Sequence, residues 1–374
     1  MTVLAPTRIF DGQRFLTDHA VAIKGDRIAA ILPTAEAGPV ARLEGTLAPG
    51  FIDLQVNGGN GLMVGGDTDA AALRQICAAH LRLGCAGVLP TLITDTPQAT
   101  AAVIAAGLRA VNTPGFLGLH LEGPHLDPRR HGAHDPSLIR PMEADDLARL
   151  CDAARGLPVL MVTLAPEAAA PDQIATLSRA GVIVSLGHTD CDYDTARTAF
   201  AAGARLATHL FNAMSPMGHR APGLVGAVLA GNAHAGLIAD GIHVHPAVLR
   251  AALAARREGI FLVTDCMAFA GTDLTAMTLA GRTIRRREGR LTLADGTLAG
   301  ADLRMDQAIG VLVEQVGIAP ERALAMATSE PARAAGLSDG YGALREGRRA
   351  DLVLLDDAWR LRSVWTAGQP VIPG

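Results

Sequence analysis

The central part of the chain alternates between short apolar runs and longer amphipathic or alanine-rich stretches. Eight apolar runs span residues 51–56, 87–93, 116–122, 159–164, 182–188, 206–211, 235–240 and 260–265. Helical patterns separate most of them, at residues 69–83, 99–111, 145–155, 172–180, 192–203 and 246–257. Continuous apolar strands that alternate with helices are typical of parallel sheets covered on both faces. Eight such units predict an α/β fold, a (β/α)₈ TIM-type barrel.

Both ends of the chain show a different pattern, with short alternating strands and tight turns. Asp11-Gly12 and Lys24-Gly25-Asp26 are typical hairpin turns, and residues 350–356 and 364–366 repeat the strand pattern near the other end. We expect a small β-sandwich domain built from both chain termini, residues 1–48 plus 341–374, beside a barrel of residues 49–340. Residues 272–300 predict an inserted hairpin after the eighth barrel strand.

Composition excludes several classes of protein. With 374 residues, 49% of them hydrophobic, the chain can bury one large barrel and a small appendage. A net charge of -4 and 3% aromatic residues give no basis for binding nucleic acid. No apolar run approaches the roughly 20 residues of a membrane span. The N-terminus shows no secretion signal, and five scattered cysteines without a Cys-x-x-Cys pair predict reduced thiols in a cytoplasmic protein.

Lysine chemistry is also excluded by composition. Lys24 is the only lysine, and it lies in the turn Lys24-Gly25-Asp26, before any barrel strand. A Schiff-base lysine, a phosphate-loop lysine or a carboxylated lysine that bridges two metals would have to be this residue. We therefore expect none of these three chemistries.

Acidic and histidine side chains follow several of the predicted barrel strands. Glu122, His188 and His209 each end an apolar run, and the carboxyl ends of barrel strands meet at one rim. A carboxylate and two imidazoles suit a divalent metal with one position left open for water. Other polar groups at the same rim are Gln55, Asn57, Asp240, His243 and Asp265. Each alone could be a rim acid, a buried core histidine or a loop cap, and their convergence favours a shared site.

The remaining histidines near Glu122 are of two kinds. His120 lies two residues before Glu122, so both side chains face the same side of the strand and His120 points into the barrel. His125, His131 and His134 lie in a loop rich in proline and arginine, and we expect them to face solvent. The glycine run at residues 57–61 does not match a dinucleotide-binding fingerprint and predicts a tight turn.

Several motifs carry a family resemblance. They are Pro49-Gly50-Phe51-Ile52-Asp53, His120-Leu121-Glu122-Gly123-Pro124, Gly187-His188-Thr189, Thr208-His209-Leu210-Phe211-Asn212-Ala213-Met214 and Val263-Thr264-Asp265. In this order they resemble N-acetylglucosamine-6-phosphate deacetylase, a family of the amidohydrolase superfamily. The resemblance covers about residues 8–356. The Glu-Gly-Pro and Thr-His-Leu-Phe-Asn-Ala-Met strings are specific, whereas the Pro-Gly-Phe-Ile-Asp string occurs across the superfamily.

The resemblance implies one divalent metal per subunit, held by Glu122, His188 and His209. Zinc suits this set best, and iron, manganese or cobalt could also occupy it. Many amidohydrolases carry His-x-His where this chain has Gln55 and Asn57, and neutral amides bind a second metal poorly. The resemblance makes Asp265 the group that takes a proton from the attacking water and passes it to the departing amine.

The resemblance also assigns substrate contacts. His243 would polarise the acetyl carbonyl, and Arg220 would clamp the 6-phosphate through its forked donors, with help from Arg130. The family motif Gly-Arg-Glu-Pro-Gly becomes His219-Arg220-Ala221-Pro222-Gly223 here, so its acidic neighbour is missing. The positions implied to contact the sugar are Ala133, His134, Asn212, Ala213, Asp240, Leu298, Ala299 and Gly300.

The resulting hypothesis is hydrolysis of N-acetyl-D-glucosamine 6-phosphate to D-glucosamine 6-phosphate and acetate. One alternative is the same reaction on N-acetylgalactosamine 6-phosphate, and another is an amidohydrolase acting on N-acyl amino acids or cyclic amides. A third is a catalytically inactive barrel that serves as a scaffold. The resemblance further implies a homodimer, with a neighbouring subunit near the phosphate.

Overall fold

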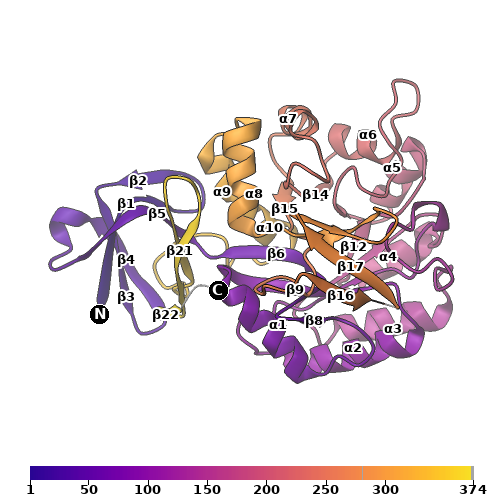
Figure 1. Cartoon of the computed structure of the whole chain (residues 1–374), viewed down its shortest axis with the longest axis horizontal. Helices are drawn as coiled ribbons and strands as arrows, with labels where there is room; N and C mark the ends of the chain where they lie inside the picture. The colour runs from indigo at the N-terminus through magenta and orange to yellow at the C-terminus, as the bar shows by residue number, and fades with distance from the viewer. Residues whose placement is uncertain (280, 372–374) are drawn as a thin grey trace.

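The computed structural model describes residues 1–279 and 281–371. A closed barrel forms one end of the molecule and a separate β-sheet the other (Figure 1). The barrel strands are β6 (Phe51–Val56), β9 (Cys85–Ile93), β10 (Leu119–Glu122), β11 (Leu160–Leu164), β12 (Ile183–Leu186), β13 (Leu206–Ala207), β14 (His234–Leu237) and β15 (Ile260–Leu262). They are parallel and pair in chain order. The backbone N–H of Asp265 donates to the carbonyl of Gln55 at 3.0 Å, which joins the segment after β15 to β6. The predicted TIM-type barrel is confirmed.

Helices cover the outside of the barrel, and α1 (Ala70–Arg82) shows why they form. The Asp69 side chain caps this helix by accepting from the backbone N–H of Ala72, while Leu73, Ile76 and Cys77 are buried against the strands. The further helices are α2 (Pro97–Ala110), α3 (Ala144–Ala154), α4 (Pro171–Arg179), α5 (Tyr193–Ala201), α6 (Gly223–Ala230), α7 (Pro246–Ala255), α8 (Met305–Gly310), α9 (Pro320–Ala327) and α10 (Ser329–Ala334). Within the described residues, none of the helices has the length and apolar character that crossing a membrane requires.

The second sheet contains strands from both ends of the chain, as the sequence predicts. It comprises β1 (Thr2–Phe10), β2 (Phe15–Thr17), β3 (His19–Lys24), β4 (Arg27–Pro33), β5 (Ala41–Pro49), β20 (Leu352–Leu355), β21 (Leu361–Thr366) and β22 (Gln369–Val371). All eight belong to one connected sheet, in which β5 lies between β1 and β20. The boundaries proposed for the two domains stay a prediction.

Four barrel strands end earlier than the apolar runs suggest. Strands β12, β13, β14 and β15 stop at Leu186, Ala207, Leu237 and Leu262, so the ends predicted at residues 188, 211, 240 and 265 were placed too late. After three of these strands the functional residue has a left-handed backbone conformation, with φ of 48° at His188, 30° at His209 and 50° at Asp265. Such backbone costs about 1–3 kcal/mol for a non-glycine residue and concentrates at active sites.

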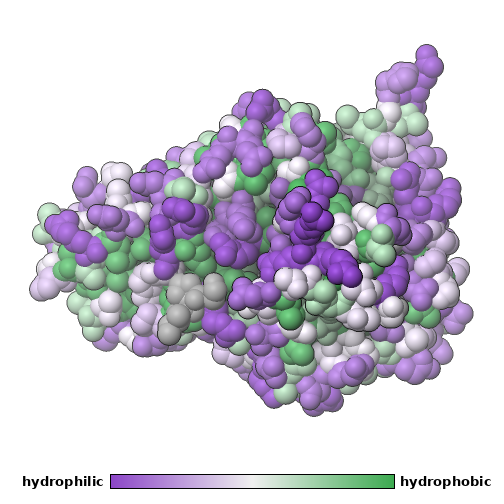
Figure 2. Space-filling model, in the orientation of Figure 1, coloured by the Kyte–Doolittle hydropathy of each residue, from purple (hydrophilic) through white to green (hydrophobic). Residues whose placement is uncertain are grey.

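The segment predicted as an inserted hairpin is a four-stranded antiparallel sheet. Its strands are β16 (Ala276–Leu279), β17 (Arg282–Arg287), β18 (Arg290–Thr292) and β19 (Leu298–Ala301). Ile284 and Leu291 face inward and pack with Met267 and Phe269. The outer face is strongly hydrophilic where β17 crosses the centre of the view (Figures 1 and 2). This sheet brings β19 to the mouth of the barrel.

Candidate active site

A cavity of about 280 Å³ opens at the carboxyl ends of the barrel strands. It is lined by most of the residues that the sequence singled out: Asn57, Glu122, Ala133, His134, His188, His209, Asn212, Ala213, His243, Asp265, Leu298, Ala299 and Gly300. The sequence did not single out the other lining residues, Met63, Ile93, Gly132, Ile238, Met267 and Thr297. These are mostly apolar, and no local pattern marks an apolar residue as cavity wall. Asp240, Arg130 and Arg220 do not line the cavity of their own chain.

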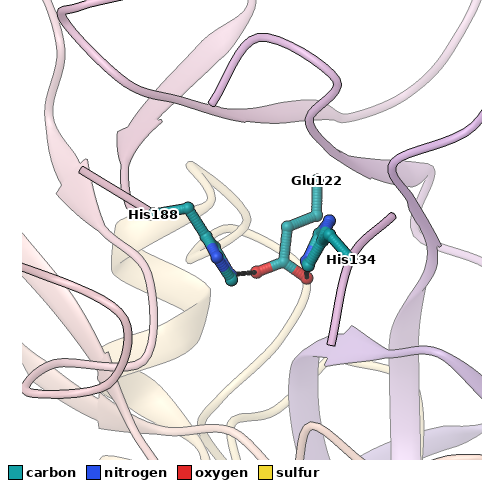
Figure 3. A group of neighbouring side chains, drawn as sticks. All are labelled: Glu122, His134 and His188. Atoms are coloured by element: carbon teal, nitrogen blue, oxygen red, sulfur yellow. Dashed lines mark ion pairs between the residues drawn. The ribbon is translucent and has the colours of Figure 1, made fainter. Parts of the chain in front are cut away.

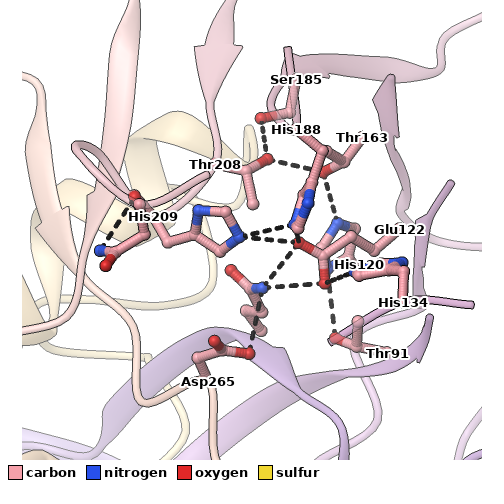
Figure 4. A network of polar contacts seen from close by, with 12 residues as sticks. Thr91, His120, Glu122, His134, Thr163, Ser185, His188, Thr208, His209 and Asp265 are labelled. Atoms are coloured by element: carbon pink, nitrogen blue, oxygen red, sulfur yellow. Dashed lines mark hydrogen bonds and ion pairs between the residues drawn. The ribbon is translucent and has the colours of Figure 1, made fainter. Parts of the chain in front are cut away.

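Three potential metal ligands converge at the base of this cavity. His209 Nε2 lies 3.0 Å from Glu122 Oε1, and His188 Nε2 lies 3.3 Å from the same oxygen. The two Nε2 atoms are 3.1 Å apart, although at most one of them can donate to the other (Figure 4). Two imidazole nitrogens and a carboxylate oxygen crowded around one point form a donor set that fits a divalent cation.

The tautomer of His188 agrees with a ligand role. Its Nδ1–H donates to the backbone carbonyl of Arg130 at 2.8 Å, so the lone pair of the neutral ring is on Nε2 and faces Glu122. Burial raises the pKa of Glu122, but the neighbouring His188 and His209 rings hold it well below its usual range. The carboxylate is therefore ionised, as a ligand must be.

His134 lies beside this group but is suited to another role. Its Nε2 is 4.0 Å from Glu122 Oε2, and Figure 3 shows the ring next to the carboxylate on the side away from His188. The backbone N–H of Thr94 donates to His134 Nδ1 at 3.2 Å, so the proton of the neutral ring is on Nε2. Burial and the neighbouring His188 hold the pKa of His134 well below its ordinary value, which keeps the ring neutral. His134 therefore presents an N–H donor to the cavity, whereas His188 presents a lone pair that can bind a metal.

The expectation that the three loop histidines face solvent is wrong for two of them. His125 and His134 are 2% and 4% exposed, and His131 is half-buried. The loop folds back over the barrel, where His125 Nδ1 meets the carbonyl of Arg140 at 3.2 Å. Proline and arginine content gave no sign of this, because burial depends on how the loop folds and not on its composition.

Two neutral amides occupy the space beside the proposed ligands. Gln55 Nε2 lies 3.2 and 3.1 Å from the two oxygens of Glu122 and 3.2 Å from Asp265 Oδ1. Asn57 Nδ2 donates to Asp265 Oδ1 at 2.7 Å. Both amide groups thus point N–H donors at carboxylates, which favours one metal over a bridged pair.

Asp265 has one oxygen held and one available. Its Oδ1 accepts the two amide donors, whereas no hydrogen bond to Oδ2 is formed within the described part of the chain. Burial, and then the negative charge of Glu122, raise the pKa of Asp265 to about 6. A carboxyl group with a pKa near neutrality can both accept and return a proton at physiological pH.

His243 is oriented by Asp240. Its Nδ1–H donates to Asp240 Oδ2 at 2.6 Å, and Asp240 Oδ1 accepts the backbone N–H groups of Ile242 and His243 at 2.8 Å each. Burial raises the pKa of Asp240, but the hydrogen bond from His243, its proximity, and the backbone N–H donors of Ile242 and His243 together lower the pKa below its ordinary value. Asp240 thus acts through His243, and leaves Nε2 of that ring facing the cavity.

The two predicted phosphate-binding arginines lie outside the cavity. The guanidinium of Arg130 is paired with Asp190, with Nε 2.8 Å and Nη2 2.5 Å from Oδ1. Arg220 is exposed and lies in the segment that precedes α6. Neither side chain reaches the site from its own chain in this arrangement.

A parallel barrel with a carboxylate, two imidazoles and a proton-accepting acid at its carboxyl rim defines a hydrolase of the metal-dependent barrel class. The model of the amidohydrolase family matches residues 46–371, and the model of the NagA composite domain matches residues 1–39. The chain therefore belongs to the amidohydrolase family, and the resemblance seen in the motifs is confirmed.

Individual relatives are similar over nearly their whole length. An N-acetylgalactosamine-6-phosphate deacetylase of Shewanella sp. (strain ANA-3) is 40% identical, over 95% of this chain and 92% of the relative. An N-acetylglucosamine-6-phosphate deacetylase of Haemophilus influenzae is 36% identical, over 91% of each. A solved variant of the Mycobacterium smegmatis N-acetyl-D-glucosamine-6-phosphate deacetylase, in complex with N-acetyl-D-glucosamine-6-phosphate, has a TM-score of 0.91 and 33% identity over 99% of each chain.

Proposed function

We propose that this chain hydrolyses the acetamide of N-acetyl-D-glucosamine 6-phosphate, which gives D-glucosamine 6-phosphate and acetate in amino-sugar catabolism. The observation that carries the proposal is the meeting of Glu122, His188, His209 and Asp265 in one cavity. The names of the relatives supply the substrate class. We retain the cytoplasm as the predicted location.

Glu122, His188 and His209 would hold one divalent cation, for which we propose zinc. When bound, such a cation acidifies water and polarises a carbonyl group. Asp265 Oδ2 takes a proton from the attacking water, while Gln55 and Asn57 hold its other oxygen in place.

The same proton completes the reaction. As the water oxygen bonds to the acetyl carbon, the carbon–nitrogen bond breaks and Asp265 returns the proton to the amine nitrogen. His243 faces the cavity through Nε2. With a proton on each ring nitrogen it would donate to the acetyl oxygen, and the Asp240 carboxylate would supply the countercharge. One preorganised donor of this kind contributes about 3–4 kcal/mol to transition-state stabilisation.

Small residues and loop turns make room for the sugar. Gly300 has φ of 63°, and a Cβ at this position would lie 2.7 Å from Met267 Cγ and 2.9 Å from the carbonyl of Asp265. The backbone of β19 can therefore approach the catalytic loop only without a side chain here. The Nε2–H of His134 adds a donor for a sugar oxygen on the opposite wall.

A second copy of the chain would complete the phosphate site. Because Arg220 lies on an exposed loop outside its own cavity, we propose a homodimer in which it reaches the phosphate in the partner's site. A mixture of Arg220→Ala and Asp265→Asn subunits tests this. Hybrid dimers would contain one site with both residues intact. At a substrate concentration well below the raised KM of Arg220→Ala, mixing the two impaired proteins should therefore restore activity. No recovery on mixing, with hybrids shown to form, would contradict the arrangement in trans.

N-Acetylgalactosamine 6-phosphate is the second candidate substrate, favoured by the 40% identical relative from Shewanella. Comparing kcat/KM on the two epimers at equal metal loading decides between them. The glucosamine epimer should be the better substrate, and a preference for the galactosamine epimer would reverse the assignment. Equal turnover of substrates without phosphate would instead favour an N-acyl-amino-acid or cyclic-amide hydrolase.

A further inference from the structure

Five buried hydroxyl and imidazole side chains form a continuous line through the barrel interior, beneath the proposed metal ligands. They are Thr91, His120, Thr163, Thr208 and Ser185, contributed by β9, β10, β11, the residue after β13, and β12. Successive polar atoms along this line are 3.2, 2.7, 2.6 and 2.6 Å apart (Figure 4). None of the five lines the cavity, and the proposed reaction uses none of them.

The direction of the first hydrogen bond follows from the contacts of Thr91. Its hydroxyl is 3.1 Å from the carbonyl of Leu89, which can only accept, and it receives the backbone N–H of Val56 at 3.1 Å. A hydroxyl has one hydrogen and two lone pairs. Because the Thr91 hydroxyl donates its one hydrogen to the carbonyl of Leu89, it can only accept at its other contacts. All of these contacts are satisfied only if His120 Nδ1–H donates to Thr91.

The remaining bonds then have only one possible order. The neutral His120 ring carries its lone pair on Nε2, so the Thr163 hydroxyl donates to it at 2.7 Å. Thr163 has no second hydrogen and accepts from Thr208, which in turn accepts from Ser185, each at 2.6 Å. The His120 ring is fully buried, and burial disfavours its charged form, in agreement with a neutral ring. Each hydrogen bond in the line therefore has an assigned donor, and the donors point in one direction, from the Ser185 hydroxyl to the carbonyl of Leu89.

This line is in contact with the segments that carry the proposed ligands. His120 precedes Glu122 by two residues on the same face of β10, and Thr208 adjoins His209. The turn before His188 packs directly on it, since a Cβ at Gly187 would lie 2.9 Å from Thr163 Cγ2 and 3.0 Å from Thr208 Cβ. A shift of any member is thus transmitted to at least one ligand.

We propose that His120, Thr163 and Thr208 are positioning residues, which hold Glu122, His188 and His209 at metal-binding spacing through a hydrogen-bond line of fixed direction. The inference rests on the proposed metal site and deepens it. It explains why four adjacent barrel strands, β9 to β12, and the residue after β13 place polar side chains in a layer that apolar residues usually fill. Partners behind a metal ligand commonly set metal affinity by fixing ligand geometry.

The decisive variant is Thr163→Val, which removes the hydroxyl and keeps the shape, with Thr163→Ser as the matched control that keeps the hydroxyl. Zinc affinity of the metal-depleted proteins is measured by competition with a chromophoric chelator, and their melting temperatures are measured separately. We expect roughly 10- to 100-fold weaker zinc binding in Thr163→Val and near-wild-type binding in Thr163→Ser. A lowered melting temperature with unchanged zinc affinity would show a purely structural role and overturn the proposal.

A spectroscopic test addresses the direction of the line. In zinc-loaded protein labelled with ¹⁵N-histidine, the resonances that disappear in His120→Gln should show a protonated Nδ1 and an unprotonated Nε2. A protonated Nε2 would contradict the assigned direction. If the wild-type protein does not bind zinc, or if Glu122→Gln does not weaken zinc binding, the proposed metal site is contradicted and this inference fails with it. Wild-type-like zinc binding in Thr163→Val would contradict this inference alone.

Discussion

Replacing Asp265 by Asn should remove catalysis while leaving the rest of the site in place. The carbonyl of an asparagine keeps the acceptor position of Oδ1, which receives the amide donors of Asn57 at 2.7 Å and Gln55 at 3.2 Å. The new amide group replaces Oδ2, the oxygen without a protein partner. The change therefore removes the proton acceptor and disturbs no hydrogen bond that holds the side chain.

The size of the effect follows from the double role of this group. General acid–base catalysis contributes about 10²- to 10⁴-fold in rate, and Asp265 both accepts and returns the proton. We expect kcat to fall about 10⁴-fold, equivalent to about 5 kcal/mol in the barrier, with KM changed little.

The assay is acetate release at saturating substrate, with the metal content of each preparation measured in parallel. Asp295→Asn is the matched control, because it makes the same chemical change at an exposed position of the inserted sheet. An Asp265→Asn protein that retains metal and more than a hundredth of wild-type kcat would refute the assigned role. Loss of metal from this variant would show that Asp265 belongs to the ligand set.

Three further predictions concern stability, ligand spacing and substrate binding. Burial raises the pKa of Asp53 from 3.8 to about 7, so the folded state binds this proton more tightly and loses stability as pH rises from about 4 to 7. Urea unfolding of metal-free protein should show Asp53→Asn gaining roughly 3 kcal/mol relative to wild type between pH 5 and pH 8, and a pH-independent difference would contradict the shift. Gly187→Ala should lower the free energy of unfolding by about 1–3 kcal/mol through overpacking and weaken zinc binding, as measured by thermal melting and chelator competition. Unchanged zinc affinity would show that this turn does not position the ligands. Arg220→Ala should raise KM for the phosphorylated substrate with a smaller effect on kcat, and an unchanged KM would exclude the phosphate contact.

The barrel could be predicted because its strands are buried on both faces. Residues 51–56 form β6 with the predicted bounds, and the amphipathic run at residues 69–83 contains α1. Helix and strand periodicity are local properties, which the sequence displays directly. The same reasoning placed Glu122, His188, His209 and Asp265 at one rim, where the structure brings them into one cavity.

Features that depend on packing between distant segments could not be predicted. The strand ends predicted at residues 188, 211 and 265 were placed too late, because the left-handed backbone at His188, His209 and Asp265 leaves no mark in an apolar pattern. His134 was expected in solvent, since its burial against Thr94 arises from a loop folding across the barrel. The hydrogen-bond line through His120 depends on side chains from four strands and from the residue after β13, and the sequence showed only that His120 faces inward.

The central claim is tested most directly by acetate release from N-acetylglucosamine 6-phosphate. The purified protein is assayed as prepared, after chelation, and after addition of zinc to the chelated sample, with Glu122→Gln carried through the same steps. We predict rapid release, its loss on chelation and its recovery with zinc in the wild type alone. Release that survives complete removal of metal, or its absence from fully metal-loaded protein on this substrate and its galactosamine epimer, would contradict the account.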